Sequence, residues 1–274
     1  MPAGCPLHSL SCEPLDRDAV LAVLGDHAAA FSVVVVPECA STNSVLLDDP
    51  PADDGRIHVL VTDRQTAGRG RRGRNWLSWP GAGLTFSVLW RFEPGAPVPA
   101  GLSLVAGLAV ARALEELGVE GVQLKWPNDV LIHGRKLAGI LVELIPGRGR
   151  TPAAVIGVGL NLRLPPEADI PHAGGVTDLA ACLTAPPTRA RLLGCLLDQF
   201  RGLLELYAAA GFPALRGAWQ QRNAHAGLPV RILGETVSQE GTCVGVDEDG
   251  ALLLNTGSGL QRVLSGEVSL RSVA

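Results

Sequence analysis

The sequence has few lysines, no paired cysteines and no long apolar run. Lysine occurs only at Lys125 and Lys136, although the chain holds 23 basic residues. The six cysteines form no Cys-x-x-Cys pair and no cluster with histidine, which argues against a metal site or a disulfide framework and predicts reduced, mostly buried thiols. The N-terminus lacks a basic region followed by an apolar signal core, and no apolar run approaches the roughly 20 residues that span a bilayer. These absences predict a cytoplasmic protein without a membrane segment.

Neither sign of charge dominates the chain. Its 23 basic and 27 acidic residues give a net charge of -4, so no overall electrostatic attraction draws it to DNA or to an anionic membrane. With 274 residues, of which 47% are hydrophobic, the chain can bury a sizeable core. Length and composition therefore favour a globular protein with one large domain and one small domain. Any contact with nucleic acid must be local.

One short loop concentrates arginine and glycine. Residues 68–74 read Gly-Arg-Gly-Arg-Arg-Gly-Arg and follow Gln65 closely. Glycine lets backbone N–H groups approach a ligand, and arginine offers a fixed fork of donors that matches carboxylate and phosphate. This arginine loop suggests a mobile flap that closes on an anion. A solvated basic loop or a nucleic-acid contact arm has the same composition, so the neighbouring motifs must decide between them.

The two lysines lie eleven residues apart, and a predicted hairpin separates them. Between them come a proline, an Asn-Asp pair and a Gly-Arg turn, which predict two short strands followed by a longer one. Codon bias explains why lysine is rare, but not why the only two lie together. The hairpin predicts that Lys125, Asp129 and Lys136 meet at one end of a sheet.

The apolar spacing predicts a mixture of helices and strands up to residue 222. Helices are expected over 15–24, 100–117, 188–210 and 212–222, and from an N-cap at Ser41 toward Leu47. Strands are expected over 32–36, 57–62, 83–92, 122–126, 130–133, 137–144 and 153–164. The arginine loop joins two of these strands and is expected at a sheet edge. Trp76 and Trp79 follow the loop, either as lids of the core or as ligand walls.

The two ends of the chain differ from this central region. Residues 1–13 carry no periodicity and are expected to form a loose tail. From Leu228 onward, Gly-rich turns separate short strands over 230–233, 241–246, 251–255 and 260–264. This pattern of short strands and Gly-rich turns predicts a small β-barrel as a second domain.

The strand over 153–164 contains Gly157, Gly159 and Asn161. Glycine weakens a strand and usually marks a place where another backbone or a ligand approaches closely. The strand is therefore expected to lie close to another backbone or to a ligand.

Taken in order, these motifs resemble biotin protein ligase. The likeness runs from about residue 30 to the end and rests on several motifs in the right order, which makes it far more specific than a lone glycine loop. The motifs are Ser41-Thr42-Asn43, Gln65, the arginine loop with Trp76, Lys125-Trp-Pro-Asn-Asp129, Arg135-Lys-Leu-Ala-Gly-Ile-Leu-Val-Glu143, Gly157-Val-Gly-Leu-Asn161 and Gly266-Glu-Val-Ser-Leu-Arg271.

The resemblance implies an α+β fold. Its core is a mixed sheet similar to class II aminoacyl-tRNA synthetases, followed by a small SH3-like β-barrel. The implied divisions are a tail and short helix over 1–30, a catalytic domain over 31–225 and the barrel over 226–274. Some family members carry an N-terminal winged helix-turn-helix. One short helix cannot form such a domain, so the resemblance implies a monofunctional enzyme.

The resemblance also implies a two-step reaction. Biotin and Mg-ATP form biotinyl-5′-adenylate and pyrophosphate, and a lysine of the biotin carboxyl carrier protein then attacks the mixed anhydride. Both reacting groups of the first step are anionic, so the site needs fixed cations. The residues implied to contact biotin or its activated carboxylate are Ser41, Thr42, Asn43, Gln65, Arg69, Gly70, Arg71 and Lys136.

The remaining roles concern the nucleotide and the acceptor amine. Lys136, Arg71 and Asp129 are the expected catalytic residues, with Asp129 orienting or deprotonating the amine. Asp129 could instead cap a turn after Asn128. The residues implied to contact ATP are Arg69, Arg71, Trp76, Asn128, Asn161 and Arg271.

Three other functions share features with this sequence. A lipoate or octanoate ligase has the same core fold, but the arginine loop and the Lys-Trp-Pro-Asn-Asp run favour biotin. A DNA-binding regulator is disfavoured by the net charge and by the missing domain. A catalytically dead biotin-binding module would bind biotin without releasing pyrophosphate. No DNA or membrane partner is expected, and a homodimer is compatible with the resemblance.

Overall fold

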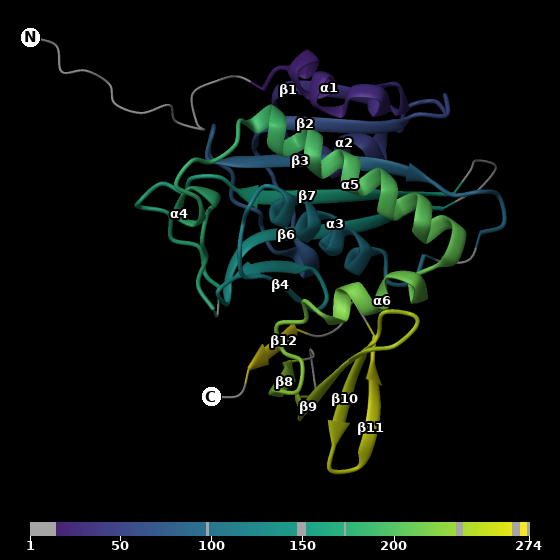
Figure 1. Cartoon of the computed structure of the whole chain (residues 1–274), viewed down its shortest axis with the longest axis vertical. Helices are drawn as coiled ribbons and strands as arrows, with labels where there is room; N and C mark the ends of the chain where they lie inside the picture. Colours follow the sequence, from purple (N-terminus) through teal and green to yellow (C-terminus); the bar gives the residue numbers. More distant parts are fainter. Residues whose placement is uncertain are drawn as a thin grey trace, which may run out of the picture.

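The computed structural model describes residues 15–96, 99–146, 152–172, 174–233, 238–264 and 269–272, with the backbone alone at 238 and 269–272. The predicted N-terminal tail and residues 266–268 of the last motif lie outside the described residues. A seven-stranded sheet with its helices forms the larger part, and a five-stranded sheet lies below it (Figure 1). The domain boundaries drawn from the sequence stay predictions.

The larger sheet is mixed, as expected. Its order is β1-β2-β3-β7-β6-β5-β4, in which only β1 and β2 run parallel. The β7 strand lies in the middle, and all nine of its residues are buried because both of its faces are covered. The strands are β1 (Phe31–Cys39), β2 (Ile57–Gln65), β3 (Gly83–Arg91), β4 (Val122–Lys125), β5 (Asp129–Ile132), β6 (Arg135–Ile145) and β7 (Ala153–Asn161).

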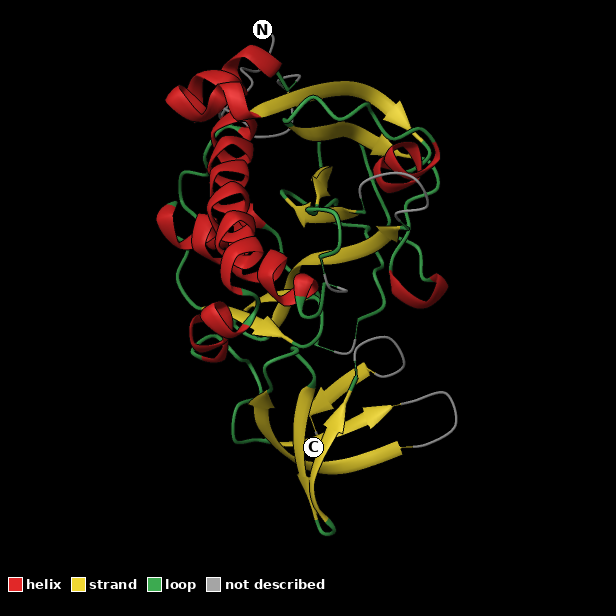
Figure 2. Ribbon diagram, turned by 90° about the vertical axis from the view of Figure 1, so that its right-hand side faces the viewer, coloured by secondary structure: helices red, strands yellow, loops and turns green. Residues whose placement is uncertain are grey.

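Helices cover both faces of this sheet. Three of them, α1, α3 and α5, pack together on one side (Figures 1 and 2), and the short helix α2 contacts β2, β3 and β7. The Leu- and Ala-rich α3 is almost wholly buried, as its apolar sequence predicts. The helices are α1 (Arg17–Leu24), α2 (Thr42–Asp48), α3 (Leu102–Glu116), α4 (Leu179–Cys182), α5 (Arg189–Ala210) and α6 (Pro213–Gln220), with 3-10 turns η1 (Gly25–Ala30) and η2 (Arg71–Gly73).

Side-chain caps explain where several helices begin. Ser41 is the N-cap of α2, as predicted, and its hydroxyl accepts from the amide of Ser44 at 3.5 Å. Thr188 caps α5 in the same way. The short α4, capped by Asp178, was not predicted, because one helical turn leaves no periodic pattern to detect.

The arginine loop does not lie at a sheet edge, so that prediction is wrong. The strands on either side of it, β2 and β3, are inner strands, and the edges of the sheet are β1 and β4. The reason is that β1 pairs in parallel outside β2. The loop instead follows the end of β2, beside the cavity described below.

The smaller sheet has one strand more than predicted. Its order is β11-β10-β9-β8-β12, and β12 pairs with β8. The strands are β8 (Pro229–Leu233), β9 (Ser238–Val246), β10 (Leu252–Thr256), β11 (Gly259–Val263) and β12 (Ser269–Ser272). All of its pairings are antiparallel. The likeness of the two sheets to a synthetase core and to an SH3 barrel stays a prediction.

Buried contacts join the two sheets. The indole N–H of Trp126, which is 1% exposed, donates to the carbonyl of Gly250 at 3.0 Å. The amide of Asn223 lies 3.6 Å from the Cys243 sulfur, and one hydrophobic core runs through both parts. The smaller sheet therefore packs against the segment that carries the Lys-Trp-Pro-Asn-Asp motif.

The cysteines are free but less buried than predicted. Of the four described, Cys39, Cys182 and Cys195 are partly exposed and only Cys243 is buried. Cys39 and Cys182 end their strand and helix, where the chain reaches the surface. Within the described residues, no helix is both long and apolar enough to cross a membrane.

Candidate functional site

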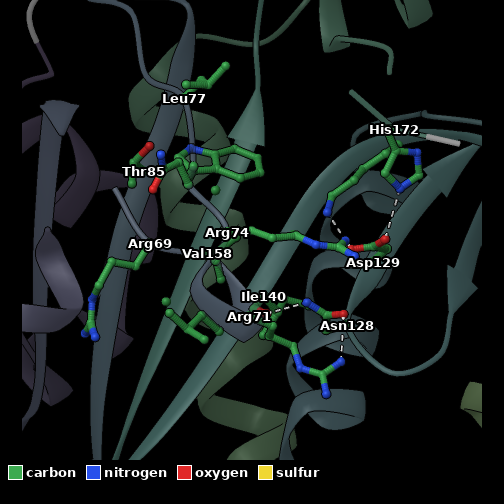
Figure 3. Close-up of a pocket in the computed structure, with 18 of the residues that line it drawn as sticks. Arg69, Arg71, Arg74, Leu77, Thr85, Asn128, Asp129, Ile140, Val158 and His172 are labelled. Carbon is green, nitrogen blue, oxygen red and sulfur yellow. Dashed lines mark hydrogen bonds and ion pairs between the residues drawn. The ribbon is translucent and has the colours of Figure 1, made fainter. Parts of the chain in front are cut away.

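A cavity of about 910 Å³ lies beside the arginine loop, at the ends of β5, β6 and β7 (Figure 3). It gathers residues from α2, the arginine loop and six strands, β2 to β7. Twelve residues predicted for the site line it: Ser41, Thr42, Asn43, Gln65, Arg69, Gly70, Arg71, Trp76, Asn128, Asp129, Lys136 and Asn161. Arg271 lies in β12, and its side chain is outside the described part of the chain.

Backbone hydrogen bonds fold the arginine loop into a small hairpin. Trp76 N–H donates to the Gly68 carbonyl at 2.9 Å, and Gly70 N–H donates to the Arg74 carbonyl at 2.7 Å. At the tip, Arg72 adopts a left-handed conformation with φ 58°, followed by Gly73 with φ 70°. Glycine thus allows the chain to reverse direction tightly, and the arginine side chains project from a defined backbone.

Two arginines of the loop point to opposite sides of the cavity (Figure 3). Arg69 forms an ion pair with Glu143, with 2.7 Å between Nη2 and Oε2. Arg71 donates a long bond of 3.4 Å to the Asn128 side-chain oxygen. Burial lowers the pKa of Arg71, and the neighbouring arginines lower it further, against the opposing charge of Asp129. A guanidinium remains charged at any ordinary pH, so the loop brings fixed positive charge to both sides.

One end of the cavity is a closed network of neutral polar groups. Gln65 Oε1 accepts from both the backbone N–H and the hydroxyl of Thr42, at 2.7 and 3.2 Å. The Ser87 hydroxyl lies 2.6 Å from both Thr42 Oγ1 and Asn43 Oδ1. Because the oxygen of Gln65 is already occupied, its amide nitrogen is the group left to donate to a ligand.

Glu143 and Ser87 belong to this end, and the sequence analysis assigned neither a role. Asn43 Nδ2 donates to Glu143 Oε2 at 2.9 Å, the same oxygen that pairs with Arg69. Glu143 thereby links α2 to the arginine loop across β6. Glu143 is the last residue of the motif over 135–143, so the sequence did mark its position. Ser87 lies in an apolar strand, where no motif points to a role for it.

The other end of the cavity concentrates charge. Lys136 Nζ lies 2.6 Å from Asp129 Oδ1, and Lys125 faces Asp129 in the pairing of β4 with β5. The prediction that these three residues meet is therefore confirmed. Burial alone would raise the pKa of Asp129, but the charge of Lys136, the hydrogen bonds that Asp129 shares with His172 and Lys136, and the charge of Lys125 hold it below its ordinary value. Asp129 is an ionised carboxylate at neutral pH.

His172 also reaches Asp129, which the sequence did not reveal. Its Nε2 lies 3.3 Å from Asp129 Oδ2. The segment that carries it is bound to β6, because Lys136 N–H donates to the Gly175 carbonyl and Thr177 N–H donates to the Lys136 carbonyl. A single histidine in a proline-rich loop, 43 residues from its partner, carries no local pattern.

The glycines of β7 leave room for side chains. A Cβ at Gly159 would overlap the indole ring of Trp76, and a Cβ at Gly157 would overlap the side chain of Asn43. The predicted close approach is therefore real, and side chains make it. Trp76 is a wall of the cavity, whereas Trp79 does not line it.

The two asparagines predicted for the nucleotide have structural bonds as well. Asn128 Nδ2 donates to the Ile140 carbonyl at 2.8 Å, and Asn161 Nδ2 donates to the Thr177 carbonyl at 3.0 Å. These bonds fix both amides at the lining of the cavity. Their oxygens keep room for further bonds.

The arrangement suits an anionic ligand with a polar, uncharged part. Asp129 is the acidic residue of the lining, and six cations line the same cavity: Arg69, Arg71, Arg72, Arg74, Lys125 and Lys136. Within the described residues, no three histidine, cysteine, aspartate or glutamate side chains gather in a way that could hold a metal ion. The cavity can therefore bind carboxylate or phosphate through side-chain and backbone donors.

Two protein families match the chain. Residues 38–161 match the biotin/lipoate A/B protein ligase family. This segment holds all the site residues predicted from the sequence except Arg271, together with the end of β1 and all of β2 to β7. Residues 225–271 match the biotin protein ligase C terminal domain. The two matched segments carry the cavity and the smaller sheet.

Individual proteins give the same result. The bifunctional ligase/repressor BirA of Escherichia coli is 38% identical over 248 residues, covering 88% of this chain and 74% of that protein. A biotin--[acetyl-CoA-carboxylase] ligase of Mycobacterium tuberculosis is 37% identical over 264 residues, covering 93% and 95%. The structure of a biotin protein ligase from Aquifex aeolicus in complex with biotin and ATP matches with a TM-score of 0.75 and 33% identity, over 88% of this chain and 99% of that one.

Proposed function

This chain belongs to the biotin protein ligase family, and from that premise we propose how its cavity residues divide the two steps of ATP-dependent biotin ligation. The chain is a biotin ligase, and biotin and ATP are its substrates. The first step joins the biotin carboxylate to the α-phosphate of ATP and releases pyrophosphate. The second step passes biotin from the adenylate to a lysine amine. The match to a biotin protein ligase C terminal domain favours biotin over lipoate, since the other matched family includes ligases for both.

The observation that carries the proposal is the set of cations around one cavity. A carboxylate and a phosphate repel each other, and they react only where fixed positive charge offsets that repulsion. Lys136, Arg69 and Arg71 are the groups that we assign to this task. Lys136 presents a compact ammonium that can move from Asp129 to an incoming carboxylate, while the arginines grip with their planar forks.

The neutral end of the cavity is the proposed biotin pocket. Ser41, Thr42, Asn43 and Gln65 lie there. Thr42 and Gln65 bond to each other, and Asn43 is held by Glu143 and Ser87, so few rotamers are open to these side chains. Gln65 offers its amide nitrogen to the ligand. Gly70, Arg69, Arg71 and Lys136 complete the proposed biotin contacts on the side of the carboxylate.

The nucleotide is proposed to lie toward Trp76 and the asparagines. The indole ring offers a flat apolar wall over Gly159, and Asn128 and Asn161 offer fixed amides. Arg69, Arg71 and Arg271 are the proposed partners of the phosphates. We treat Mg²⁺ as part of the Mg-ATP substrate, bound to the phosphates, because the described residues supply no acidic cluster of their own.

The transfer step is assigned to Asp129. It sits beside Lys136, so its carboxylate lies next to the place where the activated carboxyl group is held. An incoming lysine arrives as an ammonium and must lose a proton before it attacks. Asp129 carries a full negative charge at neutral pH and can bind and orient that ammonium. The proposed acceptor is the biotin carboxyl carrier protein of a carboxylase, in line with the name of the mycobacterial relative.

The decisive experiment is ATP- and biotin-dependent labelling of a carrier domain. Purified chain, biotin, Mg-ATP and carrier should give a mass increase on one carrier lysine, with pyrophosphate released beforehand. Omission of ATP is the control. A chain that binds biotin and releases no pyrophosphate would be a binding module only.

Two further predictions concern substrates and partners. Mass trapping of the adenylate with biotin, lipoate and octanoate in one mixture should yield the biotin adducts. A gel shift with DNA, with and without biotin, should show no complex. A stable lipoyl adenylate or a biotin-dependent DNA complex would contradict the corresponding part of the proposal.

A further inference from the structure

We propose that His172 accepts, by way of Asp129, the proton that the acceptor amine must lose before it attacks. The inference rests on the transfer role proposed above for Asp129. None of the sequence motifs contains His172, and its place is set by the fold alone. Figure 3 shows His172 and Asp129 side by side at the charged end of the cavity.

Asp129 connects two groups of different chemistry. Its Oδ1 lies 2.6 Å from Lys136 Nζ, and its Oδ2 lies 3.3 Å from His172 Nε2. All three side chains are mostly buried, with exposed fractions of 20% for Lys136, 13% for Asp129 and 12% for His172. An amine that approaches Asp129 from the cavity therefore meets a carboxylate whose far oxygen is already in contact with an imidazole.

Asp129 needs such a partner, because it is a weak base by itself. Nearby positive charge holds it ionised, so a proton that arrives on it must move on. An imidazole is the side chain that most readily takes up and releases a proton near neutral pH. The geometry thus places a suitable proton acceptor directly behind the carboxylate.

The backbone around His172 can serve the ring in both of its charge states. Its Nδ1 lies 3.2 Å from the Gly175 carbonyl, so a proton on Nδ1 has an acceptor and Nε2 is left open toward Asp129. Once Nε2 is also protonated, both nitrogens donate, one to Gly175 and one to Asp129. In the other neutral form, the Gly174 amide at 3.4 Å can donate to Nδ1 while Nε2–H holds Asp129.

The charged groups around this pair come from four elements. They are Lys125 of β4, Asp129 of β5, Arg135 and Lys136 of β6, and Arg71 and Arg74 of the arginine loop. Asp129 is the negative group among them. Asp129 is therefore the group that faces a protonated His172 with opposite charge.

With these groups, protons and charge balance in the transfer step. The acceptor ammonium gives one proton through Asp129 to Nε2 of neutral His172. The free amine attacks the acyl carbon, the bond between that carbon and the phosphate oxygen breaks, and AMP leaves with the electron pair. The amide nitrogen then gives its second proton to the departing phosphate. The products are the biotinyl amide, AMP monoanion and the imidazolium, with the same total charge as the reactants.

His172→Gln tests proton acceptance separately from positioning. Glutamine can still donate to Asp129 from a nitrogen near that of the imidazole, but it cannot take up a proton. Single-turnover transfer from pre-formed adenylate to a carrier domain should be about 100-fold slower than wild type near neutral pH. The deficit should shrink as the pH rises toward the ordinary lysine pKa of about 10.4, because the acceptor then loses its proton unaided.

The matched control is His27→Gln. His27 also pairs with an aspartate, Asp198, at 2.6 Å, but it lies outside the cavity. This variant should transfer biotin like wild type at every pH. In His172→Gln, adenylate formation and the thermal midpoint should also stay close to wild type.

Two results would overturn the inference. If His172→Gln transfers at the wild-type rate over the whole pH range, the ring only holds Asp129 in place. If both half-reactions and the thermal midpoint fall together, the residue is structural. A failure of the proposed function itself looks different, because wild-type protein would then not label the carrier at all.

Discussion

At the scale of single residues, three cations of the cavity lie against groups that a substrate can replace. Lys136 lies against Asp129, Arg69 against Glu143 and Arg71 against the oxygen of Asn128. Each of these contacts holds a charged side chain beside an acidic or polar partner. The kind of cation then matters, since an ammonium is a compact point charge and a guanidinium is a planar fork.

Lys136→Arg should impair adenylate formation although the charge is retained. The longer, planar side chain cannot take the place of an ammonium 2.6 Å from Asp129. Gly139 leaves room for the lysine, since a Cβ at that position would lie 3.1 Å from Lys136 Nζ. We expect at least a 10-fold slower release of pyrophosphate, since misplacing a group at a reacting centre by about 1 Å can cost up to about 100-fold. Pyrophosphate release at the wild-type rate would contradict the assignment of Lys136.

Asp129→Asn should slow transfer more than adenylate formation. The amide cannot attract the incoming ammonium or pass on its proton, whereas activation of biotin depends on the cations. Single-turnover assays separate the half-reactions, with adenylate followed first and carrier labelling second. Equal losses in both would assign Asp129 to holding Lys136 in place rather than to the amine.

At the scale of elements, the arginine loop is the feature that most shapes the site. It is a hairpin with its own backbone bonds, held to the sheet through Arg69 and Glu143 and through Trp76 on Gly159. A mixed anhydride in water reacts with nearby amines, so a ligase of this type must shield its intermediate until the acceptor docks. The loop is the element best placed to provide that shield.

Arg71→Gly should let the adenylate escape. The change removes one charge-assisted contact, worth roughly 1.5–3 kcal/mol, or about 10- to 150-fold in retention. Lysines on an added bystander protein should then become biotinylated, while the enzyme, with only Lys125 and Lys136 and its N-terminus, should label poorly. A blot for biotin on the bystander and the off-rate of pre-formed adenylate measure the effect.

Arg64→Gly is the matched control for the loop. Arg64 is an exposed arginine of β2 that pairs with Glu38 at 2.7 Å and does not line the cavity. This variant should retain the adenylate. If Arg71→Gly retains it equally long and the bystander stays unlabelled, the loop is not the shield.

At the scale of the whole molecule, the smaller sheet supports the site, although none of its described side chains lines the cavity. Its Gly250 carbonyl accepts from Trp126, inside the Lys-Trp-Pro-Asn-Asp motif. The chain leading to this sheet also pairs with β4, because Leu124 N–H donates to the Arg222 carbonyl and Ala224 N–H donates to the Leu124 carbonyl. The charged end of the cavity therefore depends on both parts of the molecule.

Gly250→Ala should weaken this connection. Gly250 has a φ of 78°, and a Cβ there would lie 2.8 Å from Gly101 Cα and 3.0 Å from a methyl of Leu104. Strain of this kind costs of order 1–3 kcal/mol in unfolding free energy. Denaturant unfolding measures it, and Gly257→Ala is the control, since no atom lies within 4 Å of its Cβ position. Equal unfolding free energies for both variants would show that the packing at Gly250 can be disturbed without loss of stability.

Much of the site could be predicted from motifs taken in their order along the chain. The arginine loop, the Ser-Thr-Asn cap and the Lys-Trp-Pro-Asn-Asp run each carry local signals of glycine, capping and turn chemistry, and twelve predicted residues do line one cavity. The predicted strands match the observed ones to within three residues at each end, because apolar runs and turn residues are local signals. The family followed from several motifs in one order.

The contacts between distant segments were decided by the tertiary structure. The sheet order placed the arginine loop beside inner strands, and β12 added a fifth strand to the smaller sheet. Glu143, Ser87 and His172 entered the site through pairings across the sheet and through one loop bound to β6. The amino-acid sequence determined the local conformations and the chemical groups, because these depend on neighbours along the chain. Which groups meet depends on long-range packing, and no local pattern in a single sequence records it.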